Sequence, residues 1–343
     1  MNIATYREQR TCDERPGGGQ SIAVLTGFTL LILGGFLPPW AMALDLPLRP
    51  SEANIMHQIV ATEQLDVRLA EMPGWAKNGL LRSLESYGVD TASFHAAGIA
   101  VKDKPSMFLG FVYDAEGRVL ALSGNGPWLR NSSLRSLKGL PELRIIRIDH
   151  NGFVGRDPRI PEFDGSGFDA LVSSKLSEIK IGLSFSDAGM ERCAEIKSLR
   201  SFAVAHSRAT ESGIDYFAGH AGLTSFSIAE MASDRVTGQA LGAIAKIPHL
   251  THVGFKECFV TYDGGFVLLA PLKGQLEEID LTMSVASQAD LEKLQTDHPQ
   301  ARVLTIAPAE IVKRHKFIAA KLAKQAPPEL AVPLNAALEQ VEK

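Results

Sequence analysis

The chain has 343 residues, of which 45% are hydrophobic, 22% charged and 7% aromatic, and its formal net charge is −4. These proportions are those of a globular protein, so most of the chain can bury a core, either as two average domains or as one extended repeat domain with an addition. The acidic balance and the few aromatic residues argue against nucleic acid as a partner, because phosphates attract a basic surface and single strands need stacking platforms.

The first 43 residues have the pattern of a secretory signal. A polar stretch with three arginines precedes an uncharged run at residues 22–37, IAVLTGFTLLILGGFL. Residues 41–43 (AMA) then supply the small residues that a signal peptidase reads, so we expect cleavage after Ala43. The alternative is a retained membrane anchor through residues 22–44, because the run alone is slightly shorter than the roughly 17–25 residues that a spanning helix needs.

Residues 44–116 are predicted to be an N-terminal capping region. We expect helices over residues 51–71 and 75–87, and strands at Met107–Tyr113 and Arg118–Leu122 joined by a hairpin turn at Asp114–Gly117. A repeat array needs its first core face covered, and this region precedes such an array. A small separate ligand-binding domain is the alternative.

A six-residue phrase, L-x-x-h-x-h with h apolar, recurs eight times between residues 117 and 306. The copies are GRVLAL from Gly117, LRIIRI from Leu143, LSEIKI from Leu176, LRSFAV from Leu199, LTSFSI from Leu223, LTHVGF from Leu250, LEEIDL from Leu276 and ARVLTI from Ala301. Positions one, four and six point inward from a short strand, whereas positions two, three and five face out. We predict a parallel sheet whose strands are joined by helices, because parallel neighbours need a crossover connection.

These residues closely resemble the ribonuclease-inhibitor-like, cysteine-containing class of leucine-rich repeats, over about residues 117–306. The resemblance implies an α/β solenoid with a curved parallel sheet inside, helices outside, and a partner bound on the concave sheet face. In that class the ninth repeat position is a buried polar residue that bonds the backbone at the strand's end. Here it holds Asn151, Ser184, Ser207, Cys258 and Ser284, whereas Met231 departs from the pattern. We expect Cys193 and Cys258 to be unpaired structural cysteines, since more than two repeats separate them.

The outward strand positions order the charges on the predicted concave face, which is basic at one end, small and hydroxyl-bearing in the middle, and acidic at the other. We predict partner binding by Arg144, Arg147, Lys180, Arg200, Ser225, Ser227, His252, Glu277, Glu278 and Asp280. Folding alone does not require this order. One long gap between copies inserts residues 152–168, a loop that is either merely tolerated or reaches a ligand.

We predict no catalytic residues, no cofactor and no metal site. The chain has no Gly-rich phosphate loop, no G-x-S-x-G motif and no H-E-x-x-H motif. The eighth repeat position places His206, Glu230 and Glu257 in one row with His252 nearby, and such a row could bind a divalent ion. An exposed position that tolerates polar residues is the simpler explanation.

The repeats stop after residue 306, and residues 307–343 are predicted to be a C-terminal capping helix and tail. Five Lys or Arg residues oppose Glu310 in the expected helix, residues 310–324, which Pro327-Pro328 ends. We expect Ile311, Val312, Ile318 and Leu322 to lie against the last repeat. Attachment of this helix to an anionic membrane surface is the alternative. Residues 329–343 are expected to form a mobile tail.

The leading hypothesis from the sequence is a non-catalytic, exported module that binds a protein partner on the concave face of its solenoid. We expect it in the periplasm or outside the cell, and a retained anchor would fix it to the membrane. A structural envelope protein held by its N-terminal helix is the second hypothesis. The third is a metal-assisted envelope hydrolase that uses His206, Glu230 and Glu257.

Overall fold

The structure is a computed structural model that describes residues 44–125, 129–149, 163–182, 184–230 and 235–341. All of these belong to one compact unit, Leu37–Lys343, which has its own core. The predicted signal or anchor, residues 1–43, and most of the predicted inserted loop, residues 152–168, lie outside the described residues.

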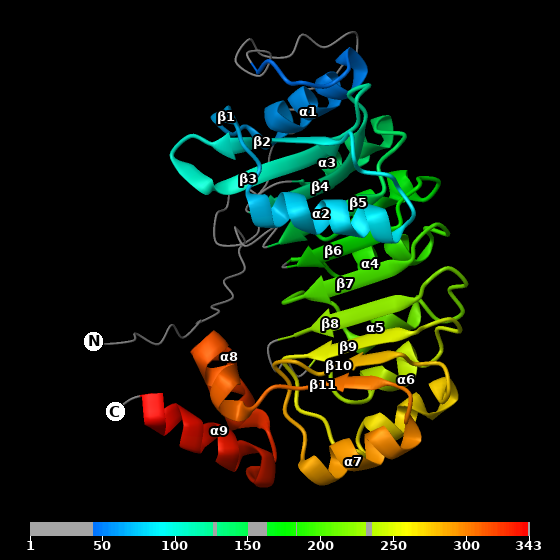
Figure 1. The fold of residues 1–343 in the computed structure, drawn as a ribbon, viewed down its shortest axis with the longest axis vertical. Coiled ribbons are helices and arrows are strands. Elements are labelled where there is room, and N and C mark those ends of the chain that lie inside the picture. The colour runs from blue at the N-terminus through cyan, green and yellow to red at the C-terminus, as the bar shows by residue number, and fades with distance from the viewer. Residues whose placement is uncertain (1–43, 126–128, 150–162, 183, 231–234, 342–343) are drawn as a thin grey trace, which may run out of the picture. The chain divides into compact units, whose positions relative to one another are not determined.

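One sheet of eleven strands in chain order runs through the described residues (Figure 1). Strands β1 to β4 pair antiparallel, and β4 to β11 pair parallel. Their bounds are β1 Val67–Ala70, β2 His95–Val101, β3 Lys104–Tyr113, β4 Val119–Asn125, β5 Ile145–Asp149, β6 Glu178–Gly182, β7 Ser201–Ala205, β8 Ser225–Ala229, β9 His252–Lys256, β10 Glu278–Asp280 and β11 Arg302–Leu304.

The eight copies of the repeated phrase coincide with the eight parallel strands, β4 to β11, as predicted. The leucines that open six of the copies are at most 1% exposed, and they are Leu143, Leu176, Leu199, Leu223, Leu250 and Leu276. The fourth and sixth positions are buried with them, so that Phe202 on β7 and Phe226 on β8 pair across strands with ring centroids 5.6 Å apart. The described residues therefore form an α/β leucine-rich-repeat solenoid.

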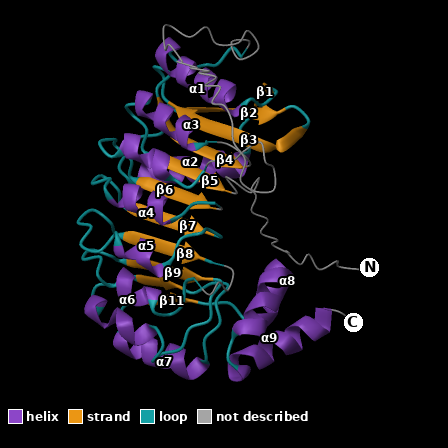
Figure 2. Cartoon of the chain, turned by 180° about the vertical axis from the view of Figure 1, so that it is seen from behind, coloured by secondary structure: helices purple, strands orange, loops and turns teal. Residues whose placement is uncertain are grey.

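Short helices and 3₁₀ turns return the chain along one face of the sheet (Figure 2). They are α3 Asn131–Ser136, η1 Leu137–Gly139, η2 Ser166–Leu171, α4 Asp187–Ala194, α5 Glu211–Asp215, α6 Ala240–Ile244, η3 Phe266–Leu272 and α7 Gln288–Asp297. Gly213 lies inside α5, where an added Cβ would meet the Asp187 side chain, and glycine disfavours a longer helix. Since several units have only one helical turn, the ribonuclease-inhibitor-like class remains a prediction.

The N-terminal cap places one helix on each face of the sheet. Helix α1, Pro50–Glu63, packs its Met56 and Ile59 into the repeat core, whereas α2, Gly74–Ser86, packs on the opposite face of β3 and β4. The prediction of one helix over residues 51–71 was wrong at its end. Gln64 takes a left-handed conformation, with φ of +53°, and the chain then turns into β1. Strand β2 was not predicted.

Two helices follow the last strand. They are α8, Pro308–Gln325, and α9, Pro328–Val341, which pack on each other beside the loops after β9 and β10. The prediction of a mobile tail was therefore wrong, because Leu330 and Leu334 of α9 are buried against α8. Helix α8 is kinked at His315, where φ is −155° and ψ is 80°. None of the helices in the described ranges is both long and apolar enough to span a membrane.

Candidate functional site

The sheet face opposite α3 to α7 displays the outward positions of the repeats, and we call it the open face. In-register pairing aligns the fifth positions of successive strands into one row, which reads Arg147, Lys180, Ala203, Ser227, Gly254 and Asp280. A second row of third positions reads Ile145, Glu178, Ser201, Ser225, His252 and Glu278. The structure thus brings most of the predicted partner-binding residues onto one surface, in the predicted order.

Helix α2 covers the basic end of the open face. Its Leu80 and Leu84 are fully buried, in a cluster with Ile145 of β5. Arg147 donates hydrogen bonds to Glu178 on β6 and to Ser83 on α2. Arg147 therefore joins the cap to the sheet, and its role in partner binding stays a prediction.

The residue after α2 completes this contact. The Tyr87 hydroxyl donates to Glu178 at 3.2 Å. Burial and the adjacent carboxylate raise the pKa of Tyr87 above its ordinary value, so the hydroxyl stays protonated as a donor. This network could not be predicted from the sequence, because Tyr87 and Glu178 are 91 residues apart.

The acidic end of the open face is largely neutralised by neighbouring strands. Lys256 on β9 pairs with Asp280 on β10, and Arg302 on β11 pairs with Glu278. Burial raises the pKa of Asp280, but bonds from Lys256 and Thr282 outweigh it and hold that pKa below its usual value. Glu277 is exposed to solvent, whereas Glu278 and Asp280, the other two acidic residues predicted to bind a partner, are half-buried.

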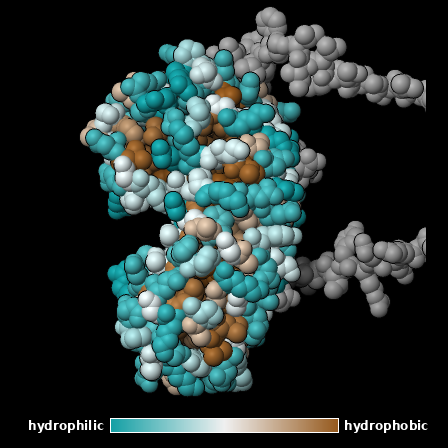
Figure 3. Space-filling view, turned by 90° about the vertical axis from the view of Figure 1, so that its right-hand side faces the viewer, coloured by the Kyte–Doolittle hydropathy of each residue, from teal (hydrophilic) through white to brown (hydrophobic). Residues whose placement is uncertain are grey.

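A central hollow of about 260 Å³ lies between these two ends, over β6 to β9. Its lining residues are Lys180, Gly182, Ala203, Val204, Ala205, His206, Ser227, Ala229, Lys256 and Glu257. The floor is made of small side chains, and the charged residues stand around it. Figure 3 shows this unit from the side, with its surface indented at mid-height. Of the predicted partner-binding residues, the central hollow contains Lys180 and Ser227.

Two of the three residues of the predicted acidic and histidine row meet at the rim of the central hollow. His206 Nε2 lies 2.7 Å from Glu257 Oε2, although these residues follow β7 and β9 and are two strands apart. Both have a left-handed backbone, with φ of +53° and +57°. Met283, which holds the same repeat position in a later unit, has φ of +67°, so this conformation is a recurring feature of the turn that follows a repeat strand.

The third member of the row, Glu230, points into the core instead. Its Oε1 accepts hydrogen bonds from Ser207 N at 3.2 Å and from Ser207 Oγ at 2.8 Å. Glu230 thereby takes over the bonding that the ninth repeat position provides elsewhere, one residue before the departing Met231. Two units further along, Ser284 Oγ accepts from Cys258 N at 3.1 Å and donates to Phe255 O at 2.7 Å, as the resemblance implies.

Burial raises the pKa of Glu230 to about 7, although the bonds from Ser207 act in the opposite direction. Among the described residues its Oε2 accepts no hydrogen bond, and the Arg235 guanidinium lies 4.0 Å away. A carboxyl group with this pKa is partly protonated near neutral pH.

The described residues contain no group of three or more His, Cys, Asp or Glu side chains that could hold a metal ion. His252 does not lie near the row, because it opens β9 whereas Glu257 follows its other end. Cys193 and Cys258 are free and buried, as predicted. Burial raises the pKa of both thiols, which keeps them unreactive.

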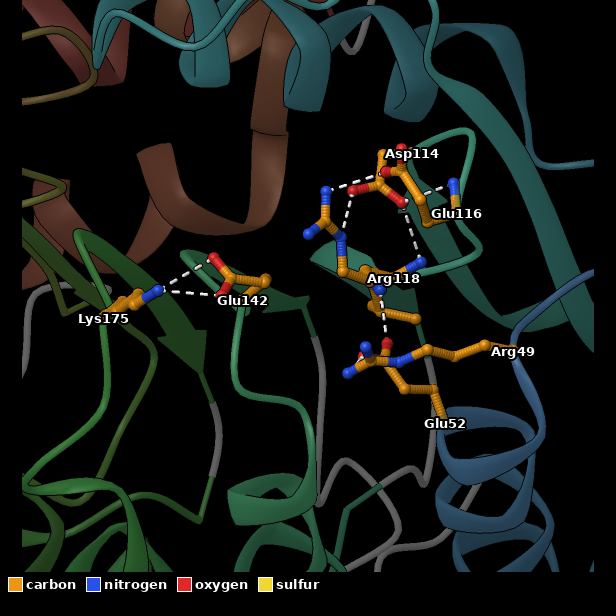
Figure 4. Close-up of polar contacts among 8 residues, drawn as sticks. Arg49, Glu52, Asp114, Glu116, Arg118, Glu142 and Lys175 are labelled. Atoms are coloured by element: carbon orange, nitrogen blue, oxygen red, sulfur yellow. Dashed lines mark hydrogen bonds and ion pairs between the residues drawn. The ribbon is translucent and has the colours of Figure 1, made fainter.

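A second cluster of charges lies in the N-terminal cap and has a structural role (Figure 4). Asp114 accepts from the backbone and the side chain of Arg118, which closes the turn between β3 and β4. The buried Glu52 of α1 accepts from the backbone of Val119 and pairs with Arg49. These contacts join α1 to the first repeat strand, and none of their residues lines the central hollow.

No family model matches the chain, and no curated protein matches it. Among solved structures, it is similar to a leucine-rich-repeat protein of Leptospira interrogans, with a TM-score of 0.31 and 12% identity over 50% of this chain and 45% of that chain. It is also similar to an internalin of Listeria monocytogenes, with a TM-score of 0.32 and 13% identity over 54% of each chain. The chain spans about half the length of each of these structures.

Proposed function

We propose that the chain is a protein-binding module that accommodates one large side chain of its partner in the central hollow. The observation that supports this proposal is the floor of Ala203, Ala205, Ala229 and Ser227, on a face whose two ends are otherwise engaged by the protein itself. Folding of the sheet does not require small side chains at these neighbouring positions. Their presence supports a partner side chain that fills the space above them.

The size of the central hollow favours a protein side chain over a cofactor. Small-molecule sites usually enclose about 300–1,000 Å³, and this volume is about 260 Å³. Protein interfaces concentrate their binding energy where one anchoring side chain enters a desolvated pocket. The Lys180 and Lys256 stems and the His206–Glu257 pair would surround such an anchor with polar groups at its rim.

The test is to fill the central hollow. Ala203→Tyr places a bulky side chain on its floor, and Ala218→Tyr makes the same change at an exposed position after α5. Fragments of residues 44–343 carrying each change are used for affinity capture from an envelope extract. We expect a partner that the wild type and Ala218→Tyr both capture and Ala203→Tyr loses, with similar melting temperatures. Equal capture by all three fragments would refute the proposal.

We further propose that the protein is exported and acts in the cell envelope or outside the cell without catalysis. The uncharged run at residues 22–37 supports export, and sequencing of the mature N-terminus should then begin near Leu44. An intact Met1 on a protein recovered from the cytoplasm would contradict it. A retained N-terminus in the membrane fraction would favour the structural, anchored alternative.

A metal-assisted hydrolase is less well supported. The His206–Glu257 bond and the inward position of Glu230 leave the row without three groups directed at one point. Stoichiometric metal in the purified protein, lost in His206→Ala, would support it instead.

A further inference from the structure

Helix α8 concentrates positive charge on a chain that is acidic as a whole. Between Pro308 and Gln325 it carries five Lys or Arg residues and one Glu, a net charge of +4, whereas the whole chain has −4. Glu310 is engaged by Arg314 at 2.9 Å and by Lys313 at 3.9 Å. The other three basic residues, Lys316, Lys321 and Lys324, follow the kink at His315.

The packing of α8 separates an apolar side from a basic side. Ile311, Val312, Ile318 and Leu322 are at most 2% exposed, and they face α9 and the loops after β9 and β10. In the segment after the kink, Phe317, Lys321 and Lys324 follow one another at intervals of four and three residues, which places them along one side of the helix. We call these three residues the basic face of α8.

Phe317 distinguishes the basic face of α8 from a merely solvated charged surface. Its side chain is 58% exposed, although it lies within a helix that buries its other large apolar residues. The Lys321 ammonium group lies 5.4 Å from the centre of its ring. An exposed aromatic ring among lysines is the arrangement by which amphipathic helices lie in a membrane interface, with the ring in the acyl boundary and the ammonium groups at anionic headgroups.

We propose that the basic face of α8 binds the surface of an anionic phospholipid membrane, with Phe317 entering the interface. The contact is peripheral and does not depend on the protein-binding function of the central hollow. Helix α8 lies beside the ends of the last strands (Figure 1), whereas the central hollow is formed by β6 to β9 and the residues that follow them. Membrane binding and partner binding therefore use different elements.

The experiment uses residues 44–343, which contain every described element and the core, and measures flotation with lipid vesicles. Vesicles of phosphatidylcholine alone are compared with vesicles containing 30% phosphatidylglycerol. We expect binding to the anionic vesicles only, weakening as salt rises. Each elementary charge removed from the face should weaken binding about fivefold, so Lys321→Glu with Lys324→Glu should weaken it by two orders of magnitude or more. Phe317→Ser should weaken it about tenfold without changing the salt dependence.

The control makes the same charge change elsewhere. Lys104→Glu with Lys197→Glu reverses two exposed lysines, one on β3 and one after α4, and should bind like the wild type. An equal loss in this control, binding to neutral vesicles, or undiminished binding by the α8 variants overturns the proposal. Binding to a single-stranded oligonucleotide in preference to anionic vesicles also overturns it. Melting temperatures of all variants are measured, so that a loss of vesicle binding caused by unfolding is recognised by a lower melting temperature. Phe317→Leu keeps an apolar side chain at this position and should keep its binding.

Discussion

The buried carboxyl group of Glu230 should make the stability of the protein depend on pH. Its pKa is raised from 4.5 to about 7 in the folded protein, because 2% exposure removes water that would solvate the anion. The folded state therefore binds this proton more tightly than the unfolded state. Stability from this group is greatest below pH 4.5, falls as the pH rises toward 7, and stays low above that.

The magnitude follows from the shift. A change of about 2.5 pKa units corresponds to about 3 kcal/mol between pH 4.5 and pH 8. Glu230→Gln removes the ionisation but keeps an oxygen that can accept from Ser207 N and Oγ. The variant can lose stability at every pH, since its new amide group has no assured partner, at a cost of about 1–3 kcal/mol. That loss does not vary with pH.

The assay is urea denaturation followed by circular dichroism at pH 5, 6, 7 and 8 and constant ionic strength. The free energy of unfolding of the wild type should fall by about 2–3 kcal/mol more than that of Glu230→Gln over this range. Glu277→Gln, at an exposed carboxylate, should keep the wild-type dependence. Parallel curves for the wild type and Glu230→Gln would refute the reasoning, because the pKa of Glu230 would then be the same in the folded and the unfolded state.

Three further predictions concern the repeat core and the cap. Leu199→Ala, Leu223→Ala and Leu250→Ala should each lower the free energy of unfolding by about 2–5 kcal/mol, since all three are fully buried at equivalent positions, and near-neutral effects at all three would mean that the repeats are misaligned. Cys258→Ser should have a mild effect in the same measurement, because the thiol donates to Lys256 O and Ser fills this position in other units. Tyr87→Phe removes the bond to Glu178 and should cost about 1 kcal/mol, with faster amide exchange in α2 than in α4, and unchanged exchange would show that the bond does not hold the cap.

The repeat array could be predicted because each copy carries its own local pattern. Leu199, Phe202 and Val204 alternate with outward residues, and the same phrase eight times leaves one sensible arrangement. The buried bonding at Cys258 and Ser284 followed from the resemblance in the same way. Strand β2 and helix α9 have no such repetition, so composition alone did not reveal them. Helix α9 also contains Pro333, and proline is disfavoured in a helix interior.

Only part of the central hollow could be predicted from the sequence, for a physical reason. Its small floor residues, Ala203 and Ser227, occupy outward positions that the repeat pattern identifies. Which charges remain available around them depends on contacts between distant residues. Arg147 is hydrogen-bonded to Ser83 of α2, and Asp280 forms an ion pair with Lys256 of the neighbouring strand. The sequence predicts a long gradient of charge on the open face, whereas the contacts at its two ends leave the central hollow as the proposed binding site. A partner of this protein should accordingly be recognised by the shape of one inserted side chain more than by the sign of its charge.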